Sequence, residues 1–284
     1  MIRLDAATVL LQWAVGGLLF LWVTTRRREV GIGYGWLLRG TYIVFAAGAV
    51  AAGAALEWVP VRDVCSVLVV AAALAAMGVS IARRKAGVSG QREQAYERTA
   101  RVAAMTGIER TVAERDASAP EFPPVLDLVA PAIGVVGLVA AALDAGGNHW
   151  VSLLRVLVGA AFLGAITDAM LLGHWYLVQP GLSRAPLLEL VRWTAWVWPV
   201  EVVAMLLPTG MLSVWSGAVD DGYNGTLGWF WGACAISTII LCLVTRAALR
   251  ERSYSAVMAA TGLLYLAILT AFGTDLVARA ALAS

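Results

Sequence analysis

Eight separate apolar stretches fill most of this chain, and they constrain its fold more than any other feature. The hydrocarbon core of a bilayer is about 30 Å thick, so one helical crossing needs roughly 20 mostly apolar residues. Hydrophobic residues make up 60% of the sequence and charged residues only 14%, which is typical of a membrane protein. The predicted spans are about 7–25, 40–58, 64–82, 125–143, 151–178, 187–208, 228–246 and 254–278.

Spans of this length predict an all-α fold. Backbone groups in hydrocarbon must form their hydrogen bonds within the protein, and a helix does so within one segment. The short alternating segments of a membrane β-barrel are absent from the sequence. We therefore expect one polytopic transmembrane helix bundle covering residues 1–284, with no convincing repeat between its halves.

The distribution of basic residues predicts the orientation. With both termini outside, 17 of the 21 Lys and Arg residues fall in cytoplasmic loops, and only Arg3, Arg62, Arg155 and Arg279 fall on the other side. An excess of Lys and Arg marks cytoplasmic loops. This pattern predicts a multi-pass protein of a bacterial-type inner (cytoplasmic) membrane with outer N- and C-termini.

Residues 83–124 form the only sizeable polar segment. Within 91–115, Ala, Glu and Arg predominate, and Tyr96, Val102, Met105 and Ile108 form a rough apolar stripe. This pattern favours a cytoplasmic amphipathic connecting helix. The helix either contacts headgroups or a partner protein, or is a solvated connector. The lipid bilayer and other membrane or peripheral subunits are the expected partners, and nothing indicates nucleic-acid binding.

The segment from the end of the fifth predicted span into the sixth has the most polar groups. It contains His174, Trp175, Tyr176, Glu189 and Arg192. If a turn at Pro180-Gly181 folds the sixth span back, these side chains would meet at one depth, where they suit a quinone headgroup that needs proton donors and flat rings. Alternatively, they are ordinary interface residues, with Glu189 and Arg192 as an i,i+3 ion pair.

Two carboxylates are expected inside apolar spans, Asp168 and Glu201. An ionisable group at such a depth costs roughly 2.5–3.5 kcal/mol or more, and usually faces the bundle interior on a proton, ion or substrate path. Asp275 lies nearer a span end and is predicted to be interfacial.

Other cofactor sites have little support in the sequence. His149 is expected in an outer loop and His174 at the inner end of the fifth span, roughly 37 Å away along a helix, so the two cannot share one haem. A haem is therefore not expected, and a quinone is the only cofactor suggested. The cysteines Cys65, Cys234 and Cys242 have no metal-ligand or disulfide spacing. No catalytic residue set is recognisable.

Three functions remain open at this stage. The first is a membrane subunit of a respiratory or redox complex for electron transport, which interacts with quinone or conducts protons. The second is a non-catalytic anchor or assembly subunit of a larger complex. The third is a small-solute or ion transporter that uses Asp168 and Glu201.

Overall fold

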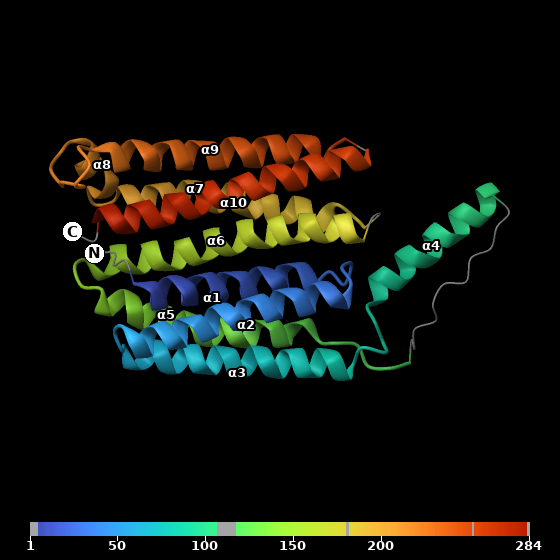
Figure 1. The fold of residues 1–284 in the computed structure, drawn as a ribbon. Helices are drawn as coiled ribbons and strands as arrows, with labels where there is room; N and C mark the ends of the chain where they lie inside the picture. Colours follow the sequence, from blue (N-terminus) through green and yellow to red (C-terminus); the bar gives the residue numbers. More distant parts are fainter. Residues whose placement is uncertain (1–4, 107–117, 180–181, 252, 283–284) are drawn as a thin grey trace.

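The computed structural model describes residues 5–106, 118–179, 182–251 and 253–282. All regular elements in these ranges are helices (Figure 1). Their bounds are α1 Ala6–Thr25, α2 Ile32–Ala55, α3 Pro60–Ala82, α4 Ser89–Thr106, η1 Pro124–Leu128, α5 Val129–Asp144, α6 His149–Val178, α7 Ala185–Leu206, α8 Gly210–Trp215, α9 Thr226–Ala248 and α10 Tyr254–Leu282. The all-α prediction is confirmed.

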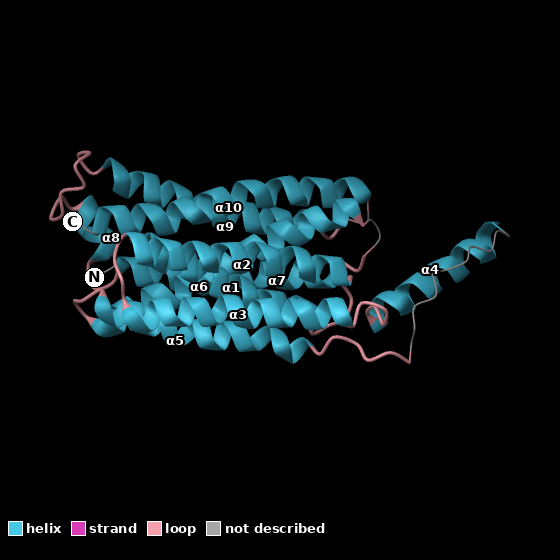
Figure 2. Cartoon of the chain, turned by 60° about the horizontal axis from the view of Figure 1, so that its bottom comes forward, coloured by secondary structure: helices cyan, strands magenta, loops and turns pink. Residues whose placement is uncertain are grey.

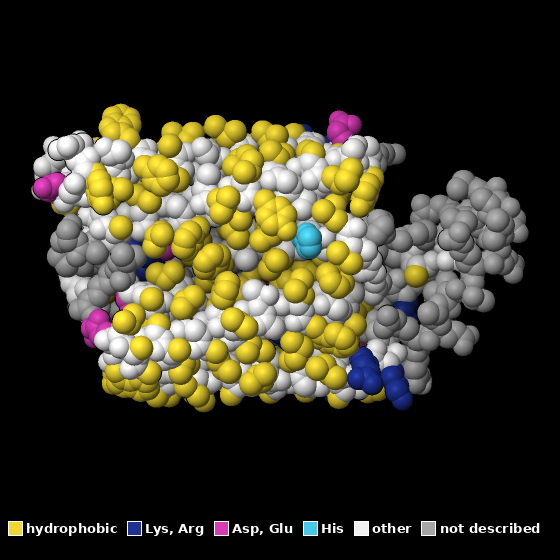
Figure 3. All heavy atoms as spheres, in the orientation of Figure 1, with side chains coloured by type: hydrophobic (Ala, Val, Ile, Leu, Met, Phe, Trp, Pro, Cys, Tyr) yellow, Lys and Arg dark blue, Asp and Glu magenta, His cyan; other side chains and the backbone are white. Residues whose placement is uncertain are grey.

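Seven of these elements are long and apolar enough to cross a membrane: α1, α2, α3, η1 with α5, α6, α9 and α10. The remaining predicted span, the sixth (187–208), corresponds to α7, which has the necessary length but carries Glu189, Arg192 and Glu201. Apolar side chains are spread over the long face of the bundle that Figure 3 shows, as expected for a surface in contact with lipid. The chain is therefore a helical bundle with the features of a multi-pass membrane protein.

The long helices form two groups of four, each arranged as a ring. In the first group α1 contacts α2 and α5, and α3 closes the ring by contacting the same two helices. In the second group α6 contacts α7 and α10, and α9 closes the ring in the same way. The two groups lie side by side in Figure 1 and share one chain order, a similarity of topology that the sequence did not reveal.

The two rings meet where α1 crosses α6. A Cβ on Gly16 would lie 1.8 Å from the backbone oxygen of Ala160, and one on Gly164 would lie 2.2 Å from the carbonyl carbon of Gly16. Only glycine permits such an approach, which is how small residues pack membrane helices together. The spacing of Ala160 and Gly164 thus serves contact with α1.

Both termini lie at one end of the bundle, called here the termini end, and α4 stands away from the opposite end, the α4 end (Figures 1 and 2). At the termini end, Asp5 accepts hydrogen bonds from the first turn of α1, and Asn148 caps α6 in the same way. The predicted helix 91–115 begins at Ser89 and is described as far as Thr106, while residues 107–117 lie outside the described part.

Two predicted helix starts are wrong. The second span begins at Ile32 rather than near residue 40, which places Arg39 inside α2 instead of in a loop. His149, predicted in an outer loop, is the first residue of α6 because Asn148 caps the helix directly before it. Both helices extend beyond their apolar stretch because polar residues can occupy buried or terminal helix positions.

Candidate functional site

The residues expected to form a quinone site do not converge. The ring of His174 is exposed on α6, and its Nδ1 lies 3.1 Å from the hydroxyl of Tyr265 on α10. The hydroxyl of Tyr176 donates to the backbone oxygen of Ser183. The ring of Trp175 packs against Tyr34 of α2, with centroids 6.2 Å apart. Each aromatic side chain therefore faces a different neighbour, because successive helix positions are rotated by about 100°.

The expected ion pair between Glu189 and Arg192 is also wrong. Glu189 accepts a hydrogen bond from Arg26 at 2.6 Å and another from Arg27, both in the loop after α1. Arg192 is exposed on α7. The hydrogen bond to Glu189 raises the pKa of the Arg27 guanidinium above its ordinary value. Glu189 thus connects the two four-helix groups at the α4 end.

A buried group of polar and charged side chains lies nearer the termini end, where α1, α6, α7 and α10 approach each other. We call it the charge cluster, and all its members are at most 4% exposed. It consists of Gln12, Arg155, Glu201, Asp275 and Arg279.

Arg279 links three members of the charge cluster. Its Nε donates to Asp275 at 2.7 Å, and its terminal nitrogen donates to the side-chain oxygen of Gln12. Gly159 of α6 leaves room for this group, since a Cβ there would lie 2.2 Å from the Gln12 side-chain nitrogen and 3.1 Å from an Asp275 oxygen. Asp275 is therefore buried and ion-paired, which corrects the prediction that it is interfacial.

Arg155 occupies the end of α7. Its Nε donates to the backbone oxygen of Ala204 at 3.0 Å, and a terminal nitrogen donates to that of Leu207. These carbonyls have no partner within the helix because α7 ends at Leu206. The guanidinium thus neutralises the negative end of the helix dipole inside the bundle.

Glu201 differs from the other members of the charge cluster. It is fully buried, and neither carboxyl oxygen has a hydrogen-bond partner among the described residues. Arg155 and Arg279 attract its negative charge, while Asp275 repels it. Glu201 is thus a buried carboxyl group without a hydrogen-bond donor among the described residues, in the electrostatic field of two arginines.

A cleft connects the charge cluster with the termini end. It is small, with a free volume of about 20 Å³, and is lined by Asp5, Thr8, Val59, Arg62, Ala141, Asp144, Ala145, Val156 and Arg279. In Figure 3, basic and acidic atoms are visible between apolar ones near that end of the bundle. Arg279 belongs to both the cleft and the charge cluster, and the other members of the cluster do not line the cleft.

Asp168 lies apart from this cluster, deeper along α6. It is fully buried, as expected for an intramembrane carboxyl, and its Oδ1 accepts a hydrogen bond from the hydroxyl of Tyr42 on α2. Glu201 lies on α7 close to Arg155 and Arg279. Both carboxyl groups are therefore buried inside the bundle, at different places.

Two further buried ion pairs were missed in the sequence. Arg62 donates to Asp63 at 3.0 Å through each of two nitrogens and also contacts Asp5. At the α4 end, Arg39 donates to both oxygens of Asp127 at 2.8 Å.

Arg39, Arg62, Arg155 and Arg279 are not the loop charges that the sequence predicted. All four are buried inside the bundle. The signal that could have revealed them is an arginine within or directly beside an apolar span, with a carboxylate near the end of another span.

In the part of the chain that the structure describes, no three His, Cys, Asp or Glu side chains are grouped closely enough to hold a metal ion. No protein-family model, no curated protein and no solved structure matches this chain.

Proposed function

We propose that this protein transfers protons across a membrane, with Glu201 as a carboxyl group that exchanges them. The observation that carries the proposal is the full burial of Glu201, whose two oxygens have no hydrogen-bond donor among the described residues. Ionisable residues at such positions are costly and usually lie on an ion or proton path.

Arg155 and Arg279 determine the net charge of the cluster in each protonation state of Glu201. The guanidiniums remain charged at any physiological pH. With Asp275 and Glu201 both ionised, two positive and two negative charges balance in the cluster. Protonation of Glu201 leaves one net positive charge, which the nearby cleft can expose to water and to counter-ions. Glu201 can therefore gain or lose a proton without first breaking a hydrogen bond to a fixed donor.

We place the termini end outside and the α4 end in the cytoplasm of a bacterial-type inner membrane. Support comes from the basic residues of the loops, most of which lie on the α4 side. The burial of Arg62, Arg155 and Arg279 strengthens the argument, because three of the four apparent exceptions are interior side chains rather than loop charges. In this orientation the cleft opens outward.

Proton flux into proteoliposomes tests the proposal. Purified protein is reconstituted with a pH-sensitive dye inside, and a potassium gradient with valinomycin drives proton entry. The unmutated chain should acidify the lumen, and Glu201→Gln should reduce the rate at least tenfold while the protein still folds. Glu251→Gln, which makes the same change at an exposed position between α9 and α10, serves as the control. Absence of flux through the unmutated chain, or full flux in Glu201→Gln, would overturn the proposal.

A second candidate function rests on the hydrogen-bonded His174–Tyr265 pair. Both rings are exposed on the apolar surface of the bundle near the α4 end, and they meet edge to face at 84°. An imidazole and a phenol that reach lipid can donate to a quinone carbonyl, and the imidazole can exchange a proton on reduction. This would give the chain a place in a quinone-dependent redox complex.

Quinone binding separates the second candidate from the first. Quenching of tryptophan fluorescence by a short-chain ubiquinone in detergent gives the apparent Kd. His174→Ala should weaken binding at least tenfold, whereas His149→Ala, at the other end of the same helix, should leave it unchanged. Equal Kd values for both variants and the unmutated chain would remove this candidate.

A further inference from the structure

Asp168 forms a second buried carboxyl site, distinct from the charge cluster. Its Oδ1 accepts a hydrogen bond from the Tyr42 hydroxyl, while its Oδ2 is buried and has no partner among the described residues. The hydroxyl of Tyr34, about two helical turns before Tyr42 on α2, lies 3.5 Å from the Asp168 backbone oxygen. The neighbouring Thr167 accepts a hydrogen bond from Trp13 of α1 at 2.7 Å.

The electrostatic surroundings of Asp168 differ from those of Glu201. The titratable groups that face it are the phenols of Tyr42 and Tyr34, both from α2. Helix α10 also packs against α6, but its charged residues Asp275 and Arg279 lie at the level of Gly159 and not at that of Asp168. Without a facing cation, a carboxylate at this depth has no compensation for its lost hydration.

Asp168 and the charge cluster lie at different levels along α6. Asp168 lies nine residues, or roughly 14 Å, beyond Gly159, at whose level Gln12 and Asp275 meet. It also lies ten residues, or about 15 Å, before the end of α6 at Val178. Helix α6 (His149–Val178) therefore carries two polar levels along its length, and the level of Asp168 is the one nearer the α4 end.

We propose that Asp168 and Tyr42 form a second proton-binding site, in which Asp168 is a protonated carboxyl that releases its proton from Oδ2. Proton binding at this site rests on the contacts of Asp168 itself and not on the proposed function of Glu201.

The chemistry of release needs only water as the acceptor. The O–H bond at Oδ2 breaks, a water molecule takes the proton, and both electrons of that bond stay on the carboxylate. The hydrogen bond from Tyr42 then becomes charge-assisted and shorter, which stabilises the anion until a proton returns. Tyr42 is thus a positioning residue that keeps its own proton and lowers the cost of ionising Asp168.

Infrared difference spectroscopy of the full chain in detergent tests the site directly. At neutral pH the unmutated protein should show a carboxylic acid C=O band that shifts in D2O and is lost in Asp168→Asn. Asparagine has almost the same shape and can still accept from Tyr42, so the fold should persist. Tyr42→Phe should move the band to higher frequency, because the C=O group loses its donor.

Glu201→Gln is the control that separates the two proposals. It should leave the Asp168 band in place even if it abolishes proton flux. Absence of an acid band that depends on Asp168, or a band that does not respond to D2O, would overturn the Asp168 site whatever the flux assay gives. If the band is present but the liposomes carry no flux, the proposed function fails while the proton-binding site stands.

Discussion

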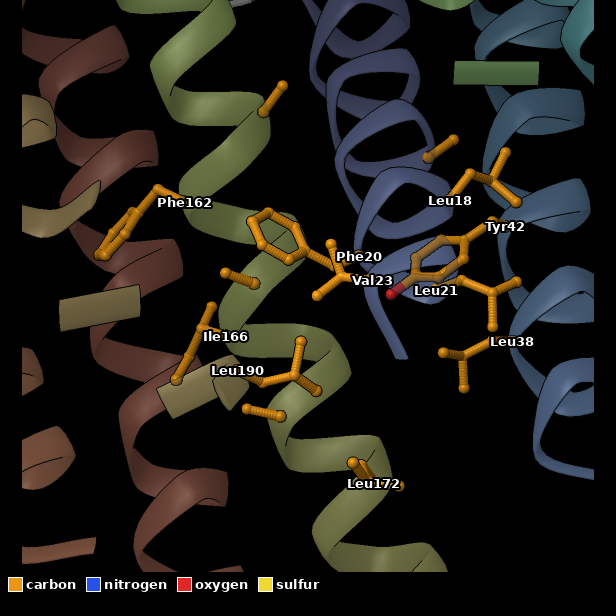
Figure 4. Packing of buried hydrophobic residues seen from close by; sticks show 14 of the residues in the cluster. Leu18, Phe20, Leu21, Val23, Leu38, Tyr42, Phe162, Ile166, Leu172 and Leu190 are labelled. Carbon is orange, nitrogen blue, oxygen red and sulfur yellow. The ribbon is translucent and has the colours of Figure 1, made fainter. Parts of the chain in front are cut away.

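The ring of Tyr42 lies directly against the α-carbon of Gly17. A Cβ on Gly17 would fall 1.9 Å from the ring carbon that carries the hydroxyl. Figure 4 shows this ring reaching from α2 toward α1, with Leu18, Leu21 and Leu38 nearby. The glycine on α1 therefore determines where the phenol that contacts Asp168 can lie.

Gly17→Ala should displace Tyr42 from Asp168 without removing either group. The added methyl overlaps the ring, and overpacking of this kind costs about 1–3 kcal/mol. We expect a lower Tm in detergent and an infrared acid band resembling that of Tyr42→Phe. The combination Gly17→Ala with Tyr42→Phe should have no greater spectral effect than Tyr42→Phe alone. An unchanged band and Tm in Gly17→Ala would show that the helices move apart freely at this point.

Arg62→Met should destabilise the termini end strongly. Arg62 is 1% exposed and holds Asp63 and Asp5 by ion pairs. Removing one partner of a buried pair leaves an uncompensated charge, at a cost of about 3–5 kcal/mol. Thermal unfolding followed by circular dichroism should therefore show a large decrease in Tm. Arg84→Met, at an exposed position after α3, should change Tm little, and equal Tm values for the two variants would contradict the buried pair.

The loop between α8 and α9 should loosen in acid because of Asp221. Its carboxylate accepts three backbone hydrogen bonds of 2.9 Å, from Tyr223, Gly225 and Leu227. Partial desolvation raises the pKa of Asp221, but these hydrogen bonds outweigh it, so the pKa lies below its ordinary value. A lowered folded-state pKa gives stability above the unfolded pKa of about 3.9, and this stability is lost as pH falls through the folded value.

Hydrogen exchange at these amides measures the effect. Protection at Tyr223, Gly225 and Leu227 should be constant above about pH 4, relative to the intrinsic exchange rate, and should decrease below it. In Asp221→Asn the protection should be lower at neutral pH and should no longer depend on acid. Identical pH profiles for both proteins would assign the loop's stability to other contacts.

Labelling with a membrane-impermeant maleimide should reveal the orientation. The three native cysteines are buried, which keeps the background low. Lys85→Cys, after α3, and Asp220→Cys, before α9, lie at opposite ends of the bundle. In right-side-out vesicles only the Asp220→Cys protein should react, and in inverted vesicles only the Lys85→Cys protein. The reverse result would place both termini in the cytoplasm.

The sequence predicted those parts of the fold that depend on the number and length of its apolar segments. Asp168 and Glu201 could be predicted as buried because few positions outside the bundle interior tolerate a carboxylate at that depth. The partners of His174, Tyr176 and Glu189 could not be predicted, since they depend on which helix lies beside α6 and α7. Tyr265 is 91 residues away from His174, and Arg26 is 163 residues away from Glu189.

The sequence by itself determined the all-helical class, the approximate spans and the even number of long helices that brings both termini to one end. These properties depend on hydrocarbon thickness and on backbone hydrogen bonding, which each span satisfies alone. Only the tertiary structure decided which residues form the charge cluster, that Tyr42 contacts Asp168, and that the helices divide into two rings. Helices that are apolar on all sides carry little sequence information about which face points inward. Their rotation is fixed by close contacts such as Gly16 with Gly164 and by the buried ion pairs of Arg62 and Arg279.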